Sequence, residues 1–119
     1  MFEKMSESAG NVVGFRVSGH ITKEDYQALT PEVQALVDHE GSIGLLLDLE
    51  QFKWEDVSAW GADLKFGQTY RHKIAKLAIV GDKRWQHLIV NLADPFYAHE
   101  SKYFHLADRA AAWAWLHTT

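Results

Sequence analysis

The chain has 119 residues, 47% of them hydrophobic and 24% charged, which is typical of one globular domain and excludes disordered, collagen-like and coiled-coil chains. It contains no cysteine, which excludes disulfide scaffolds, thiolate zinc sites and thiol nucleophiles. Its net charge of −4 argues against general nucleic-acid binding, and no apolar run approaches the ~18 residues of a membrane-spanning helix. We therefore expect a single domain over residues 1–119. We expect it in the cytoplasm, because its first ten residues lack the apolar core of a signal peptide.

The beginning of the sequence predicts a β-hairpin. Residues 2–8 form a weak strand candidate, and residues 12–19 form a clearer one with alternating apolar side chains. Between them, Ala9-Gly10-Asn11 is typical of a tight turn, because Gly and Asn tolerate positive φ.

A helix is predicted next. Thr22 and Asp25 form a capping box in which Asp replaces the usual Glu. The apolar residues that follow have helical spacing: Tyr26, Leu29, Val33, Leu36 and Val37. Pro31 lies inside this pattern, so we expect it to kink the helix or to start a second one.

The rest of the sequence alternates strands with helices. Short apolar runs predict strands over 43–50, 76–81 and 102–106, and helices are expected over 55–70, after a cap at Asp82, and after a cap at Asp108. This order predicts an α/β fold. We expect a single mixed, mostly parallel sheet of 4–5 strands, with an N-terminal β-hairpin and about four packed helices.

The sequence offers little for catalysis. Seven histidines are scattered without metal-ligand spacing, and we find no serine-hydrolase elbow and no phosphate-binding loop, so no metal, cofactor or catalytic residue is expected. Asp48 lies in the apolar run LLLDLE, on the opposite face from Leu45, Leu47 and Leu49. It is either a functional carboxylate or a structural one that hydrogen-bonds a neighbouring turn. Asp48 with His105 is the only catalytic dyad that the sequence suggests. We expect that the protein is not an enzyme.

The segment from Phe52 to Trp85 combines aromatic and basic side chains. Charge is unevenly spread: residues 1–63 hold 4 basic and 12 acidic residues, whereas residues 64–119 hold 8 and 4. Aromatic plus basic is the composition of a surface that meets anionic lipid, or of a groove for an amphipathic ligand. A helix packed on a sheet also needs aromatics, so a structural role stays open. The predicted binding residues are Trp54, Trp60, Lys65, Phe66, Tyr70, Arg71, Lys73, Lys76 and Trp85.

Several stretches together resemble one family over nearly the whole chain. NVVGFRVSGHIT, EDYQALTPEVQAL, LLLDLEQF, DLKFG, LAIVGDKRWQ and ADPF are similar to the SpoIIAA-like family, which is related in fold to STAS and CRAL-TRIO domains. The resemblance implies a small bacterial cytosolic protein that associates with membranes or binds a small apolar ligand. The phosphorylated serine of STAS-type antagonists would fall on Val57, which cannot accept phosphate, and Ser58 is one position away.

Two functional hypotheses follow. In the first, the chain is a non-catalytic module that lies on the inner membrane face or holds a lipid-like ligand, with the helix over 55–70 open or closed on the sheet. In the second, it is a STAS-like module for a protein partner, without the phosphoserine, with the acidic residues of 22–40 as one candidate surface. Trp113 and Trp115 face about 200° apart on a helix. One of them is therefore expected outside the core, which favours self-association as a homodimer.

Overall fold

The computed structural model describes residues 1–55, 59–82 and 100–118. Five strands form one sheet in the order β1-β2-β3-β4-β5. They are β1 (Phe2–Lys4), β2 (Val12–Ile21), β3 (Ile43–Glu55), β4 (Ile74–Gly81) and β5 (Glu100–His105). β1 pairs antiparallel with β2, and the other neighbours pair in parallel. The predicted mixed, mostly parallel sheet with an N-terminal hairpin is confirmed.

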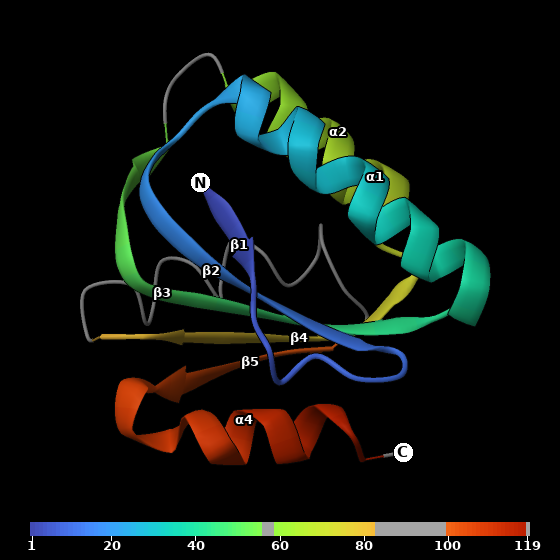
Figure 1. Cartoon of the computed structure of the whole chain (residues 1–119), viewed down its shortest axis with the longest axis vertical. Helices are drawn as coiled ribbons and strands as arrows, with labels where there is room; N and C mark the ends of the chain where they lie inside the picture. The colour runs from blue at the N-terminus through green and yellow to red at the C-terminus, as the bar shows by residue number, and fades with distance from the viewer. Residues whose placement is uncertain (56–58, 83–99, 119) are drawn as a thin grey trace.

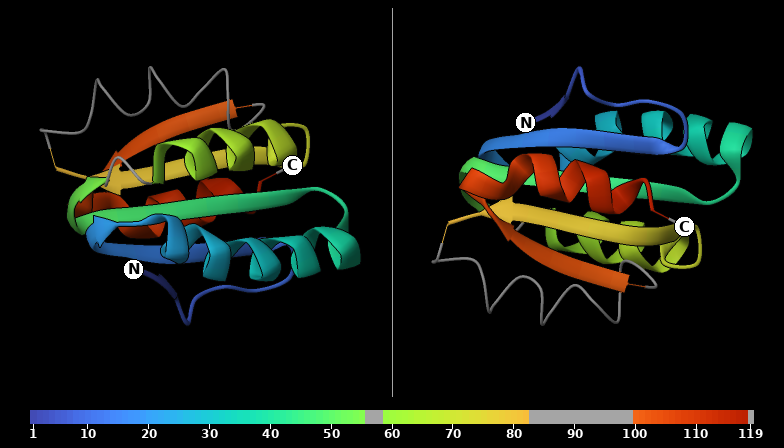
Figure 2. Two further views of the ribbon diagram at one scale, coloured as in Figure 1. Left: turned by 90° about the horizontal axis from the view of Figure 1, so that it is seen from above. Right: turned by 90° about the horizontal axis from the view of Figure 1, so that it is seen from below.

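Helices cover both faces of the sheet (Figures 1 and 2). Helix α1 (Lys23–Glu40) and helix α2 (Trp60–Tyr70) lie side by side on one face, which we call the upper face as in Figure 1. Helix α4 (Arg109–Leu116) follows a 3-10 turn, η2 (Leu106–Asp108), and lies on the lower face. The described residues contain these three α-helices rather than four. The helix expected after Asp82 falls in residues 83–99, outside the described part of the chain.

The hairpin turn forms where the sequence predicts it. The backbone N–H of Ala9 donates to the carbonyl of Val12 at 2.9 Å, and the N–H of Val12 donates to the carbonyl of Ala9 at 3.0 Å. Gly10, with φ of 59°, occupies the position where a side chain would be strained. The turn thereby fixes the pairing of β1 with β2, in which Lys4 is opposite Phe15.

Helix α1 begins with the predicted capping box. The N–H of Asp25 donates to Thr22 Oγ1 at 3.3 Å, and the Asp25 carboxylate accepts from the N–H of Thr22 at 2.8 Å. The expectation that Pro31 starts a second helix is wrong, because α1 is one helix from Lys23 to Glu40. Pro31 and Gln27 are both exposed, so water can bond the Gln27 carbonyl that Pro31 leaves without an amide donor.

Strand β3 is longer than predicted, and α2 is shorter. We expected the strand to end at residue 50 and a helix to run over 55–70. Instead β3 continues to Glu55, because β2 pairs with it to the end, with His20 opposite Trp54 and Ile21 opposite Glu55. The helix begins only at Trp60. Trp54 therefore belongs to a strand end and not to the beginning of a helix.

The sheet separates two apolar cores. The upper core joins α1 and α2 to the sheet through residues such as Phe15, Val33 and Leu45. The lower core joins α4 to the sheet through residues such as Leu46 and Ala112. Side chains of β3 alternate between them, so the prediction that Asp48 faces away from Leu45 and Leu49 is confirmed.

The two tryptophans of α4 both pack against the lower core, and both are half-buried. Trp113 lies over Gly14 of β2, and the Trp115 ring lies 5.8 Å from the Phe104 ring of β5. We expected one of them to lie outside the core. The structure instead places them on opposite flanks of α4, where each reaches a different neighbouring strand.

Candidate functional site

Exposed cations lie along α2 and in the turn that follows it. Lys65, Arg71 and Lys73, which we call the basic cluster, all have exposed side chains. None of the three has an ion pair with another described residue. The adjoining His72 is also exposed. The structure therefore leaves these three predicted binding residues accessible and without a counter-charge in the described part of the chain.

Backbone hydrogen bonds hold the turn that carries Arg71 and Lys73. The Arg71 N–H donates to the Gly67 carbonyl at 2.9 Å, and the Lys73 N–H donates to the Tyr70 carbonyl at 2.8 Å. The Lys73 carbonyl then accepts from the N–H of Ile43 at 2.8 Å, which ties the turn to the beginning of β3. The cations thus extend from an ordered backbone and not from a loose loop. Basic residues at this end also complement the dipole of α2.

The aromatic residues of α2 point into the upper core. Phe66 and Tyr70 are only 6% and 2% exposed, and their ring centres lie 4.8 Å apart. Tyr26 of α1 stands 6.1 Å from Phe66, and Phe2 of β1 stands 5.2 Å from Tyr26. These rings form a row that joins α2, α1 and the hairpin. Phe66 and Tyr70 therefore fix α2 on the sheet, and neither offers its ring to the surface.

The Tyr70 hydroxyl is part of the same contact between the helices. It donates to Gln34 Oε1 of α1 at 2.7 Å. Burial raises the pKa of Tyr70 above its ordinary value, and the negative charge of Asp38 raises it further. The phenol is consequently a neutral donor at physiological pH.

Lys76 is separated from the basic cluster. Its side chain leaves β4 on the lower face, where the ammonium donates to the carbonyls of Trp115 at 3.1 Å and Thr118 at 3.0 Å. It also lies 5.0 Å from the centre of the Trp115 ring. The ammonium thereby satisfies backbone carbonyls at the C-terminal end of α4. The sequence analysis grouped Lys76 with Lys73, but Lys76 packs against α4 on the lower face, whereas Lys73 lies in the exposed turn between α2 and β4.

The three predicted tryptophans are only partly covered by the structure. Trp54 is in β3 opposite His20, and Trp60 is the first residue of α2. The side chains of both lie outside what the structure describes, as do Trp85, Val57 and Ser58 altogether. Among the described residues, Met1 is the only exposed large hydrophobic residue. The described surface around the basic cluster is therefore polar.

A buried ion pair lies under α4, and sequence reasoning did not find it. Asp48 is fully buried, and its carboxylate accepts from Arg109 Nε at 2.8 Å and from the N–H of Glu50 at 3.0 Å. Arg109 also donates to the Glu50 carboxylate. The bond to Asp48 raises the pKa of Arg109, although burial opposes this, and Glu50 adds to the rise. The interpretation of Asp48 as a structural carboxylate is thus supported. Its side-chain partner is a cation 61 residues away along the chain and not a neighbouring turn.

Asp108 occupies the predicted N-cap position of α4, but its side chain makes no capping hydrogen bond. The 3-10 turn η2 leads into α4, and Arg109, the first residue of α4, anchors that end through its side chain. For the buried ion pair, the signal in the sequence was Asp48, the lone carboxylate in an apolar strand, because a buried carboxylate requires a hydrogen-bond donor. Nothing in the sequence indicated which cation supplies it.

The described residues form neither a metal site nor a membrane-spanning helix. No group of three or more His, Asp or Glu side chains in this part of the chain could hold a metal ion. Nor does any helix described here combine the length and the apolar character needed to cross a bilayer.

Comparison with known proteins places the chain in a family. Residues 12–117 match the sequence model of the SpoIIAA-like family. The crystal structure of an uncharacterised protein of the DUF3478 family from Shewanella loihica PV-4, which has a SpoIIAA-like fold, superposes with a TM-score of 0.78. The two chains are 25% identical over 98% of this chain and 90% of that one. No curated protein matches the sequence. Because the match covers all but the first eleven and last two residues, the chain belongs to the SpoIIAA-like family.

Proposed function

We propose that the protein is a non-catalytic module that binds an anionic membrane surface through the basic cluster. The observation that supports this is the exposure of Lys65, Arg71 and Lys73 without an ion pair in the described part of the chain. Paired cations would gain little from a lipid phosphate, whereas unpaired ones exchange only water and counterions for it. The location that follows is the cytoplasm, peripheral on the inner membrane face.

The strength of this contact can be estimated. A Lys or Arg near an anionic surface contributes about 1 kcal/mol, so the cluster contributes about 3 kcal/mol, which is roughly a 150-fold preference for anionic over neutral lipid. Phe66 and Tyr70 are buried and add no insertion into the acyl region. Binding through the described residues is therefore electrostatic, and it should weaken steeply with salt.

Vesicle co-sedimentation tests this proposal. Wild-type protein is expected to bind phosphatidylglycerol-rich vesicles at low salt and to be released at high salt, with little binding to phosphatidylcholine vesicles. The variant Lys65→Glu/Arg71→Glu/Lys73→Glu should lose this binding. Lys4→Glu/Lys23→Glu/Lys53→Glu is the matched control, since it changes the net charge equally at three other exposed lysines. Equal loss in both variants, or no vesicle binding by the wild type, would refute a localised membrane site.

A second candidate function is suggested by the outer side of α1. Glu24, Glu32, Asp38 and Glu40 are exposed on this helix, which lies beside α2. Such an acidic face suits a basic protein partner, as in the STAS-like alternative. If the wild type does not bind vesicles, this alternative can be tested by cross-linking in cell extract. The control is the variant Glu24→Lys/Glu32→Lys/Asp38→Lys. The expected homodimer stays a prediction, which sedimentation velocity can check.

A further inference from the structure

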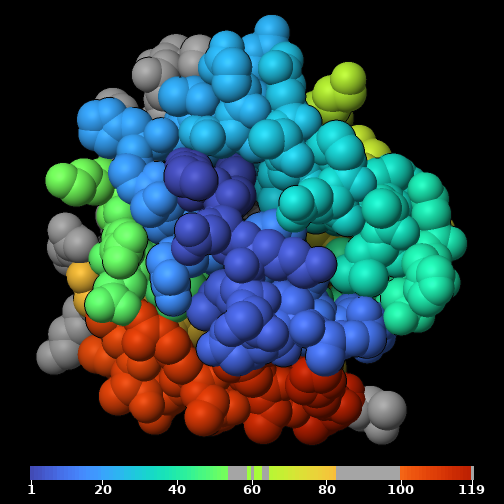
Figure 3. Space-filling view, viewed as in Figure 1, coloured from blue at the N-terminus to red at the C-terminus, as the bar shows by residue number. Residues whose placement is uncertain are grey.

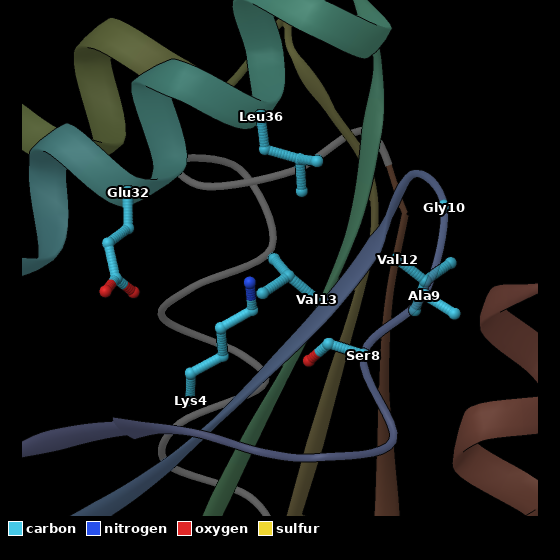
Figure 4. A pocket seen from close by; sticks show the side chains of 8 residues that line it. All are labelled: Lys4, Ser8, Ala9, Gly10, Val12, Val13, Glu32 and Leu36. Atoms are coloured by element: carbon cyan, nitrogen blue, oxygen red, sulfur yellow. The ribbon is translucent and has the colours of Figure 1, made fainter.

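A small pocket lies between the β1–β2 hairpin and α1 (Figures 3 and 4). Its volume is about 160 Å³. Pockets for drug-sized or lipid-sized ligands have roughly 300–1,000 Å³. This size suits a small molecule of a few heavy atoms.

Opposite charges enter the pocket from its two walls. Lys4 extends from β1 and Glu32 from α1, and in Figure 4 the two side chains approach the same space from opposite sides. Neither forms an ion pair with the other or with any further described residue. The pocket thus offers one cationic donor and one anionic acceptor, held on separate elements.

The hairpin adds a hydroxyl group and a fixed wall. Ser8 Oγ points into the pocket and accepts from the backbone N–H of Gly14 at 3.0 Å. Its hydroxyl proton has no acceptor among the described residues, so it is free to donate to a ligand. The hydrogen-bonded turn between Ala9 and Val12 holds this wall in place. Preorganised groups of this kind lose little freedom on binding.

An apolar floor separates the polar groups. Val13 is only 5% exposed, and Leu36 is half-buried beside it. A ligand with only a carboxylate would be attracted by Lys4 but repelled by Glu32. A ligand with only an amine would be attracted by Glu32 but repelled by Lys4. A molecule carrying both charges on a short apolar body would satisfy every group in the pocket.

We propose that this pocket binds a small zwitterion of the free amino-acid class. Glu32 accepts from the ligand ammonium, while Lys4 Nζ and the Ser8 hydroxyl donate to its carboxylate. Val13 and Leu36 contact its apolar body. This site is independent of the basic cluster and of the proposed membrane contact, because it uses none of the same residues.

Amide chemical shifts of the full chain can test this with three probes of the same apolar shape. These probes are L-valine, isovalerate without the ammonium, and isobutylamine without the carboxylate. Valine should shift the amides around Ser8 and Glu32 saturably in the millimolar range. Isovalerate and isobutylamine should each bind about tenfold more weakly, because each loses one charge-assisted contact.

Variants on both walls complete the test. Lys4→Met and Glu32→Gln should each weaken valine binding about tenfold. Both side chains are exposed, so the fold should survive. Lys23→Met/Glu24→Gln, which removes the same charges outside the pocket, should bind valine normally. So should the triple glutamate variant of the basic cluster, which separates this inference from the membrane proposal. Valine shifts that do not saturate, or that isovalerate reproduces with equal affinity, would overturn the inference.

Discussion

Asp48 of β3 and Arg109 of α4 form an ion pair of 2.8 Å beneath the sheet, and the carboxylate of Asp48 has no solvent exposure. The pair connects the first residue of α4 to the middle of the sheet. A buried charge has a large desolvation cost, so the carboxylate is tolerable only with this partner and with the N–H of Glu50. The pair therefore ties the first residue of α4 to β3 on the lower face.

Arg109→Ala should destabilise the fold strongly. Removing one partner of a buried pair leaves an uncompensated charge and costs about 3–5 kcal/mol. We expect the lower end of this range, because Arg109 is 36% exposed and water can replace part of its contact. The free energy of unfolding in urea measures the effect. Asp48→Leu/Arg109→Met should be much milder than Arg109→Ala alone, since it leaves no buried charge. If the single variant costs under about 1 kcal/mol, the pair does not hold α4.

Gly14→Ala should disturb the contact between β2 and α4. A Cβ at Gly14 would overlap the Trp113 ring, so the ring or the strand must move. Overpacking of this kind costs about 1–3 kcal/mol, and the change should be visible in tryptophan fluorescence.

Gly44→Ala is the matched control, because a Cβ there would meet its nearest atoms at 3.4 Å, an ordinary contact. We expect its cost to stay under about 1 kcal/mol, and Trp113→Leu should relieve part of the defect of Gly14→Ala. Equal effects at Gly14 and Gly44 would show that the loss of glycine, and not the ring contact, matters.

These contacts show which features can be predicted from sequence. The almost continuous apolar runs of β3 and β4 predict strands buried on both faces, and the alternation of strands with helices predicts the α/β class. Strand ends depend on pairing, so the extension of β3 to Glu55 was missed. The partners of Asp48 and Lys76 were missed for a related reason. Each joins the sheet to α4 far along the chain, and no local pattern records that distance.

The same argument explains the outcome for the candidate site. The exposed cations of the basic cluster follow from helix periodicity and the local turn. The inward direction of Phe66 and Tyr70 depends on how α2 packs against α1, through rings contributed by Phe2 and Tyr26. An aromatic-basic composition alone is therefore compatible with a membrane surface and with a core, and only packing separates the two.

Tyr70→Phe should reduce stability in a pH-dependent way. It removes the hydrogen bond to Gln34, for which we expect a loss of about 1 kcal/mol at neutral pH. Burial first, and Asp38 second, raise the pKa of Tyr70 in the folded protein. This contribution is fully present below the unfolded pKa of about 10, and it disappears as the pH rises through the higher folded pKa.

Unfolding free energies of the wild type and of Tyr70→Phe should therefore differ by a constant amount at neutral pH and converge in alkali. Tyr103→Phe should show the same convergence in alkali, because burial and then Asp82 also raise the pKa of Tyr103. A pH-independent difference for Tyr70→Phe would contradict the assignment.

Lys76→Gln and Lys73→Gln should have opposite effects on stability and membrane binding. Lys76→Gln removes the ammonium that bonds the carbonyls of Trp115 and Thr118, so we expect a stability loss of about 1 kcal/mol and faster amide exchange in α4. Its vesicle binding should not change. Lys73 is exposed and unpaired among the described residues, so Lys73→Gln should change stability by under about 0.5 kcal/mol but weaken vesicle binding about fivefold. Urea unfolding and vesicle co-sedimentation of the two variants, run in parallel, separate these roles. If Lys76→Gln weakened vesicle binding as much as Lys73→Gln, the lower face would belong to the membrane contact and the basic cluster would be only part of it.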